Sequence, residues 1–157
     1  MIIGIAAVDR KGAIGKGGKL PWHYSADMKF FRETTTGHAV VMGRKTWFTI
    51  GKPLKNRLNI VLSRDTNIDP QESLIVFSDI ESVLSFNNSL TTDLFVIGGA
   101  QIYEAFLPHI EKWIITEVPL TVQGADAFMP VGYLEGFEVV DSKSLDEDLV
   151  VKVYERG

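Results

Sequence analysis

The chain has 157 residues and no cysteine; 45% of the residues are hydrophobic, 23% are charged, and the formal net charge at pH 7 is −4. These values fit one globular domain over residues 1–157 and exclude disordered, fibrous and disulfide-rich classes, thiolate metal sites and a cysteine nucleophile. They also argue against nucleic acid as a partner, and no apolar stretch approaches the roughly 20 residues of a membrane span. We therefore expect a cytoplasmic protein with no metal site and no membrane partner.

Short apolar runs predict buried strands at residues 2–8, 39–42, 58–62 and 94–97. Helices are predicted between them at about 25–36, 44–50, 79–86 and 100–107, with caps at Ser25, Gly43, Ser78 and Gly99. After Pro108 the pattern predicts strands at 112–118, 136–140 and 149–154, the last two as a hairpin at the sheet edge. The alternation of strands and helices predicts an α/β fold with a mixed, mostly parallel sheet.

Residues 9–24 form a long segment that contains four glycines and follows the first predicted strand. Loops longer than about 12 residues are uncommon in compact domains and are often lids or binding loops. The alternative is a surface loop without a function. Ligands of open parallel sheets bind at the carboxyl ends of the strands, which is where this loop begins, so we favour a lid.

Asp27 lies in the first turn of a predicted helix, within an aromatic-rich segment at residues 21–31. An acid in this position can simply interact with the helix dipole and face water. Phe31, however, lies one helical turn further on, and Met28 lies beside the acid, so Asp27 shares a face with large apolar groups. A carboxylate in an apolar pocket has a perturbed pKa and directional hydrogen bonds. Asp27 is therefore a candidate functional acid.

Basic residues follow two predicted strands, at Arg44-Lys45 after Gly43 and at Arg64 after Ser63. Cations in the first turn of a helix oppose the helix dipole, whereas an anionic ligand would remove this cost. The alternative is that each basic side chain is a solvated surface group. Because the two strands belong to adjacent units, we predict one phosphate-rich ligand.

Gly98 and Gly99 join a predicted strand to the following helix. Consecutive glycines let a backbone pass close to a pyrophosphate, although they can also simply make a tight turn. The chain lacks the G-x-G-x-x-G fingerprint after its first strand, so a dinucleotide would be held by a fold other than the Rossmann fold.

These segments, with Leu20-Pro21-Trp22 and the runs at residues 41–47, 50–54, 56–64 and 97–103, resemble dihydrofolate reductase of the bacterial type over nearly the whole chain. The resemblance implies a three-layer fold with a central eight-stranded, mostly parallel sheet, an antiparallel C-terminal hairpin and four flanking helices. It implies an NADPH-dependent oxidoreductase of one-carbon metabolism that reduces 7,8-dihydrofolate by hydride transfer to C6 and protonation at N5. It also implies a monomer that binds antifolate inhibitors.

The resemblance implies roles for individual residues. Asp27 would hold the 2-amino group and N3 of the pterin, Thr116 would support this acid, and Trp22 would orient a water, with Leu20 as a fourth catalytic residue. Arg57 would bind the glutamate α-carboxylate. The implied substrate contacts are Ile5, Ala6, Asp27, Met28, Phe31, Ile50, Leu54, Arg57, Ile97, Tyr103 and Thr116. The implied NADPH contacts are Ala7, Ile14, Gly15, Gly43, Arg44, Lys45, Thr46, Leu62, Ser63, Arg64, Gly98, Gly99, Ala100, Gln101, Ile102 and Tyr103.

The chain departs from the family pattern in three places. Tyr24-Ser25 stands where a Leu-Pro pair is common, Ala100 replaces a frequent third glycine, and residues 124–130 follow the family's Gly-Asp loop only loosely. Two alternative functions remain. One is a pyrimidine reductase of the riboflavin pathway, whose resemblance does not include an acid five residues after a Pro-Trp pair. The other is a non-catalytic folate- or nucleotide-binding domain, which we would expect to lose the acid or the cations.

Overall fold

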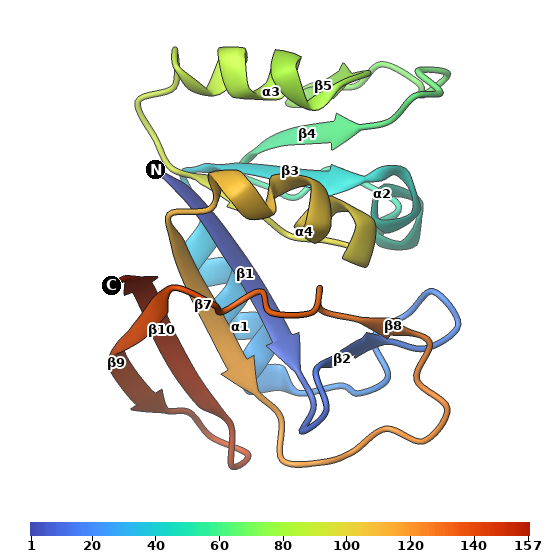
Figure 1. The fold of residues 1–157 in the computed structure, drawn as a ribbon. Helices are drawn as coiled ribbons and strands as arrows, with labels where there is room; N and C mark the ends of the chain where they lie inside the picture. Colours follow the sequence, from blue (N-terminus) through green and yellow to red (C-terminus); the bar gives the residue numbers. More distant parts are fainter.

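An eight-stranded mixed sheet forms the centre of the molecule, whose computed structural model describes all 157 residues (Figure 1). In spatial order its strands are β5 (Leu74–Phe77), β4 (Leu58–Leu62), β3 (Ala39–Gly43), β6 (Leu94–Val96), β1 (Ile2–Val8), β7 (Lys112–Glu117), β10 (Val150–Arg156) and β9 (Phe137–Ser144). All neighbouring pairs from β5 to β7 are parallel, and the pairs β7–β10 and β10–β9 are antiparallel. The predicted mixed sheet and terminal hairpin are confirmed.

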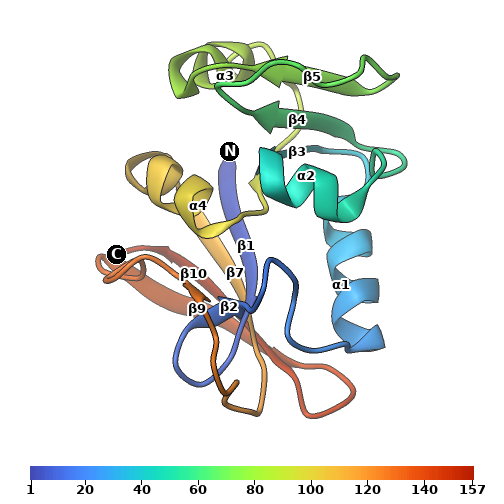
Figure 2. The same ribbon diagram turned by 90° about the vertical axis from the view of Figure 1, so that its right-hand side faces the viewer.

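Helices cover both faces of this sheet, as Figure 2 shows. They are α1 (Ser25–Thr35), α2 (Arg44–Ile50), α3 (Ile80–Asn87) and α4 (Ala100–Phe106), followed by a short 3-10 helix, η1 (Leu107–His109). Alternate strand residues point to opposite faces. Val41 accordingly packs with Val83 of α3 and Phe106 of α4, whereas Val40 packs in a second core cluster with Trp47 of α2. The predicted three-layer α/β architecture is confirmed, and no helix is long and apolar enough to cross a membrane.

Two predicted helix caps are wrong. Ser25 is the first helical residue of α1; the cap position belongs to Tyr24, which makes no side-chain capping bond. The cap of α3 is Asp79, whose carboxylate accepts the backbone N–H of Ser82 at 2.7 Å. Ser78 and Asp79 are adjacent and both residue types favour the cap position, so the sequence alone did not show which of the two is the cap.

Some strands differ from their predicted bounds. The strand predicted at 94–97 ends at Val96, and the strand predicted at 136–140 extends to Ser144. Strand β5, which is four residues long, was not predicted, and neither was a small second sheet made by β2 (Ala13–Gly15) and β8 (Ala127–Phe128). The second sheet pairs the segment after β1 with the segment after β7, so the long loop at 9–24 is anchored to the rest of the domain.

Candidate active site

Asp27 lies in the first turn of α1, beside the carboxyl end of the central strands. Burial raises the pKa of its carboxyl above the usual aspartate value, and a hydrogen bond with Thr116 acts in the opposite direction. Thr116 is itself buried, with 2% of its surface exposed, and is paired with Ala7 across the β1–β7 ladder. The acid therefore occupies a partly desolvated position beside Thr116 of the central sheet.

Apolar side chains surround the same region. Five of the predicted substrate contacts pack in one hydrophobic cluster on the α1 and α2 face of the sheet: Ile5, Phe31, Ile50, Leu54 and Ile97. Three others lie elsewhere. Ala6 and Tyr103 pack in the cluster on the opposite face, and Met28 is 54% exposed. Tyr103 still reaches the strand carrying Ile5, because its hydroxyl donates to the Ile5 carbonyl at 2.7 Å.

Arg57 is a buried cation with N–H groups that bond to no other protein group. Its Nε donates to the Lys55 carbonyl at 2.9 Å and its Nη1 donates to Thr35 Oγ1 at 3.0 Å. Its guanidinium carbon lies 6.0 Å from the ring centre of Phe31. Burial and the neighbouring Arg32 lower the pKa of Arg57, but a guanidinium remains charged in proteins. Two of the five N–H groups are used internally, so the others can bind a carboxylate.

Two aspartates hold the loop at 9–24, and sequence reasoning missed both. The Asp9 carboxylate accepts the backbone N–H groups of Lys11 and Ala13 at 2.8 Å and that of Val122 at 2.9 Å. Burial acts to raise the pKa of Asp9, but these three bonds hold it below the usual value. An aspartate directly after a strand and three residues before a glycine is a turn signal, which could have identified this residue.

Asp126 fixes the middle of the loop. Its backbone N–H donates to the Gly15 carbonyl at 3.1 Å, and its carboxylate accepts the N–H of Gly17 at 2.9 Å. The hydroxyl of Thr49 on α2 lies 3.3 Å from the Gly18 carbonyl. The loop is therefore attached both to the segment after β7 and to the helix that begins at Arg44.

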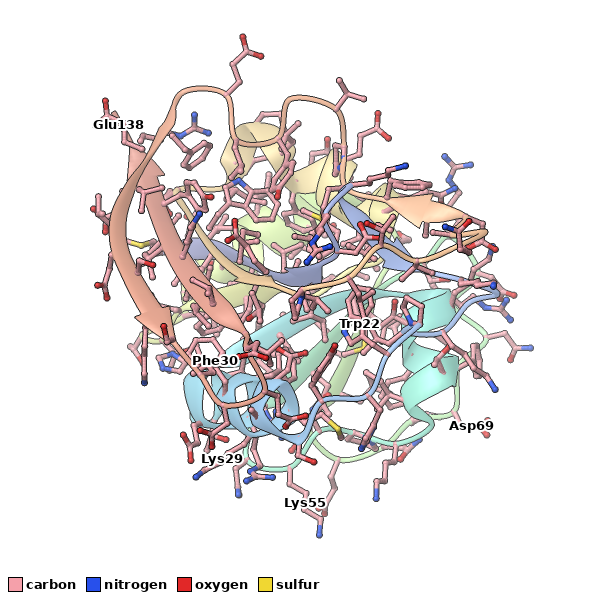
Figure 3. The ribbon with its side chains drawn as sticks, turned by 90° about the horizontal axis from the view of Figure 1, so that it is seen from below. Trp22, Lys29, Phe30, Lys55, Asp69 and Glu138 are labelled. Carbon is pink, nitrogen blue, oxygen red and sulfur yellow. The ribbon has the colours of Figure 1, made fainter.

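Trp22 and Leu20 lie at the end of this loop. The indole N–H of Trp22 is buried and bonds to no protein group, so it is free to bind a water or a ligand. Figure 3 shows Trp22 near the middle of the face seen from below, with Phe30 of α1 to one side. Leu20, by contrast, is 59% exposed.

The amino ends of α2 and α4 lie side by side. The N–H of Gly43, before α2, donates to the Gly98 carbonyl, before α4, at 2.9 Å. Neither helix has a side-chain cap, so backbone N–H groups remain available. A side chain would not fit at Gly98, where φ is 111° and a Cβ would lie 3.2 Å from the Tyr103 ring. This bare backbone beside Thr46 is suited to a pyrophosphate.

Exposed cations flank these helix ends. Arg44, Lys45 and Arg64 are all exposed, and α2 has no acid in its first turn. Arg44 lies 3.5 Å from Asp65 and 5.0 Å from the ring centre of Phe48. The backbone donors and three cations fit a dinucleotide that carries an additional phosphate, as NADPH does.

The other predicted cofactor residues line this same edge or the lid. Leu62 ends β4 opposite Gly43, and the hydroxyl of buried Ser63 donates to the Asp65 carbonyl at 2.7 Å. The remaining residues divide between the end of β1, the lid strand β2 and the first turn of α4: Ala7, Ile14, Gly15, Ala100, Gln101 and Ile102.

Comparison with known proteins identifies the family. The family model for dihydrofolate reductase matches residues 1–154. The dihydrofolate reductase of Staphylococcus haemolyticus is 35% identical, over 97% of this chain and 93% of that protein. That of Haemophilus influenzae is 37% identical, over 86% and 82%.

A solved structure agrees with these matches. Dihydrofolate reductase from Enterococcus faecalis, complexed with NADP(H) and RAB-propyl, has a TM-score of 0.90 and 30% identity, covering 100% of this chain and 96% of that one. These matches favour a reductase of dihydrofolate over the pyrimidine reductase and over a non-catalytic domain. The chain belongs to the dihydrofolate reductase family, the NADPH-dependent oxidoreductases that convert 7,8-dihydrofolate to 5,6,7,8-tetrahydrofolate.

Proposed function

We propose that this chain carries out the reaction of its family with Asp27 as the group that anchors the pterin. The observation that carries this proposal is the partly desolvated Asp27 carboxylate, whose pKa burial raises and the Thr116 side chain lowers. The 2-amino group and N3 of the pterin form a paired donor set that matches the two oxygens of a carboxylate. Bound substrate would therefore supply hydrogen-bond donors to the Asp27 carboxylate, which burial separates from water.

Asp27 stabilises the protonated pterin electrostatically and does not deliver the proton to N5. A carboxylate bonded to the 2-amino group and N3 lies at the pyrimidine end of the pterin, with the C4 carbonyl between it and N5, so the proton comes from water admitted under the lid. The free indole N–H of Trp22 orients that water. A fixed anion in a water-poor site stabilises developing positive charge more strongly than the same anion in water.

The rest of the substrate fits the neighbouring groups. The apolar cluster with Phe31, Ile50 and Leu54 packs against the pterin and benzoyl rings. The unused N–H groups of Arg57 bind the glutamate α-carboxylate, and the bonds of Arg57 to Lys55 and Thr35 hold the guanidinium in place beforehand. We expect antifolate inhibitors to use the same apolar cluster and the same acid.

NADPH, when bound, supplies the hydride that C6 of the pterin accepts. Arg44, Lys45 and Arg64 would hold its 2′-phosphate, since all three are exposed cations at the ends of neighbouring strands. Backbone N–H groups near Thr46 and Gly99 would hold its pyrophosphate. The lid would cover the nicotinamide end through Ile14 and Gly15 and exclude bulk water.

We further propose that the enzyme acts as a single-domain monomer in the cytoplasm. Every group named above comes from one chain, and the two core clusters lie on opposite faces of one sheet. The absence of cysteine is compatible with a reducing compartment. Reopening of the lid is then the step that we expect to limit turnover.

The test is Asp27→Asn, compared with Glu33→Gln on the same helix. Glu33 is an exposed acid that pairs only with Lys29, at 4.0 Å. Consumption of NADPH is followed by absorbance with dihydrofolate as substrate. We expect Asp27→Asn to lower turnover at neutral pH by about 10²–10³-fold while NADPH affinity is kept, because a single preorganised electrostatic contact is worth about this much.

Activity of Asp27→Asn should partly recover in acid, where the substrate arrives already protonated. Glu33→Gln should match the wild type at every pH. Unchanged turnover of Asp27→Asn at neutral pH would contradict the proposed role. Wild-type activity with the riboflavin-pathway pyrimidine substrate in place of dihydrofolate would contradict the proposed function itself.

A further inference from the structure

The tip of the β9–β10 hairpin touches the first turn of α1, although the two segments are far apart in the sequence. Glu147 Oε1 accepts the backbone N–H of Ala26 at 3.0 Å. Figures 2 and 3 both show this hairpin tip beside the amino end of α1. The cap residue of α1, Tyr24, makes no capping bond with its side chain. Glu147 therefore satisfies one of the N–H groups that the helix leaves unpaired.

The backbone of Glu147 is held in an unfavourable conformation. Its φ is 66° and that of Asp148 is 60°, in a turn where the N–H of Leu149 faces the Asp146 carbonyl at 3.5 Å. Turns with positive φ at both central positions strongly favour glycine and asparagine, because a larger side chain is strained there. A strained backbone of this kind persists only where surrounding contacts hold it in place.

We propose that Glu147 is a positioning residue: through Ala26 it fixes the first turn of α1, and with it Asp27, for the binding of dihydrofolate. Asp27 directly follows Ala26, so a shift of this turn moves the carboxylate against the pterin. The inference rests on the proposed substrate role of Asp27. It also predicts selectivity, because α1 contributes substrate contacts only, whereas the cofactor contacts come from α2, α4, the lid and the ends of β1, β3, β4 and β6.

The experiment compares Glu147→Gly with Asp148→Gly. Both substitutions place glycine at a position with positive φ and so relieve backbone strain, but only the first removes the bond to Ala26. The side chain of Asp148 makes neither a hydrogen bond nor an ion pair. A third variant, Glu147→Gln, keeps an amide oxygen at the position of the acceptor. Dissociation constants for dihydrofolate and for NADPH are measured by tryptophan fluorescence, together with KM, kcat and the melting temperature.

We expect Glu147→Gly to weaken dihydrofolate binding about 5-fold, the change that corresponds to one lost hydrogen bond, with NADPH binding unchanged. Asp148→Gly should bind both ligands like the wild type and melt at a higher temperature. Glu147→Gln should restore most of the dihydrofolate affinity. A purely structural role for Glu147 would instead change both affinities in step with the melting temperature.

Equal dihydrofolate affinities for Glu147→Gly and Asp148→Gly would overturn the proposal, as would a parallel loss of NADPH affinity in Glu147→Gly. Failure of Glu147→Gln to restore affinity would overturn the role of the acceptor oxygen. These outcomes differ from failure of the proposed function, in which the wild type itself would not bind or turn over dihydrofolate.

Discussion

The two halves of the carboxyl edge of the sheet carry charge in opposite ways. On the β3–β4 side three cations, Arg44, Lys45 and Arg64, lie exposed at the surface. On the β1–β7 side one acid, Asp27, is withdrawn from water beside Thr116. An exposed charge costs little desolvation free energy but interacts weakly with other charges. A charge that is withdrawn from water costs much more desolvation free energy and interacts more strongly. Function on the first side should therefore decline gradually with each substitution, and function on the second side should fail with one.

The two halves also differ in how they are fixed. The exposed cations lie where strands end, and one of these junctions is fixed by a backbone hydrogen bond from the Gly43 N–H to the Gly98 carbonyl. The acid lies among segments that are bonded to distant parts of the chain: Asp9 and Asp126 hold the loop at 9–24, and Glu147 accepts an N–H of the first turn of α1. The proposed phosphate contacts thus come from short junctions that follow adjacent strands, whereas the proposed substrate contacts depend on tertiary contacts between loops and helices.

The largest effect that tests this comparison comes from removing two cations together. Arg44→Ala combined with Arg64→Ala should weaken NADPH binding about 100-fold or more, since each charge-assisted hydrogen bond contributes about 1.5–3 kcal/mol. Each single variant should lose part of this affinity, as expected for a gradual decline. NADPH fluorescence on binding gives the dissociation constants.

The control for the double variant is Lys143→Ala, an exposed cation on the distant strand β9. This variant should bind NADPH like the wild type. NADH, which lacks the 2′-phosphate, should bind the double variant and the wild type almost equally. An equal loss of NADH affinity would show that the two arginines do not act on that phosphate.

The same contrast explains what the sequence revealed and what it did not. The apolar runs predicted most strands of the sheet, and the spacing of Asp27 and Phe31 predicted that acid and ring share a helix face. The cationic junctions were visible because Gly43, Arg44 and Lys45 are consecutive. Such features are local, and local patterns are what a single sequence displays.

The contacts that complete the substrate side are not local. Val122 lies 113 residues from Asp9, and Glu147 lies 121 residues from Ala26. No periodicity or spacing connects such pairs, so only the folded chain identifies them. Strand β5 was missed for a different reason: it is four residues long, it follows a polar loop, and all of its residues are only partly buried.

A second prediction concerns the cost of withdrawing Asp27 from water. Because burial raises its pKa in the folded state, the ionised carboxylate destabilises the fold above that pKa. Asp27→Asn, the variant that loses activity, should therefore melt at a higher temperature than the wild type at neutral pH. As the pH falls through the folded-state pKa toward the ordinary aspartate value, the wild-type carboxyl becomes protonated and the difference should shrink.

Melting temperatures of both proteins between pH 4 and pH 8 check this, with Glu33→Gln as the exposed control on the same helix. Glu33 is exposed, so Glu33→Gln should not raise the melting temperature. A melting temperature of Asp27→Asn below that of the wild type across the whole range would mean that the carboxylate stabilises the fold. The proposed cost of withdrawing Asp27 from water would then be wrong.

The smallest effect is expected from Asp65, the one acid paired with the exposed cations. Its carboxylate lies 3.5 Å from the Arg44 guanidinium, and both side chains are about half exposed, at 56% and 48%. A surface ion pair of this kind is worth at most about 1 kcal/mol, so its loss should not affect folding. It does compete with a phosphate for the same guanidinium, and Asp65→Asn should therefore bind NADPH about 2-fold more tightly. The gain should vanish at high salt, which screens exposed charges, whereas the effect of Asp27→Asn on turnover should persist there because a partly buried charge is screened much less.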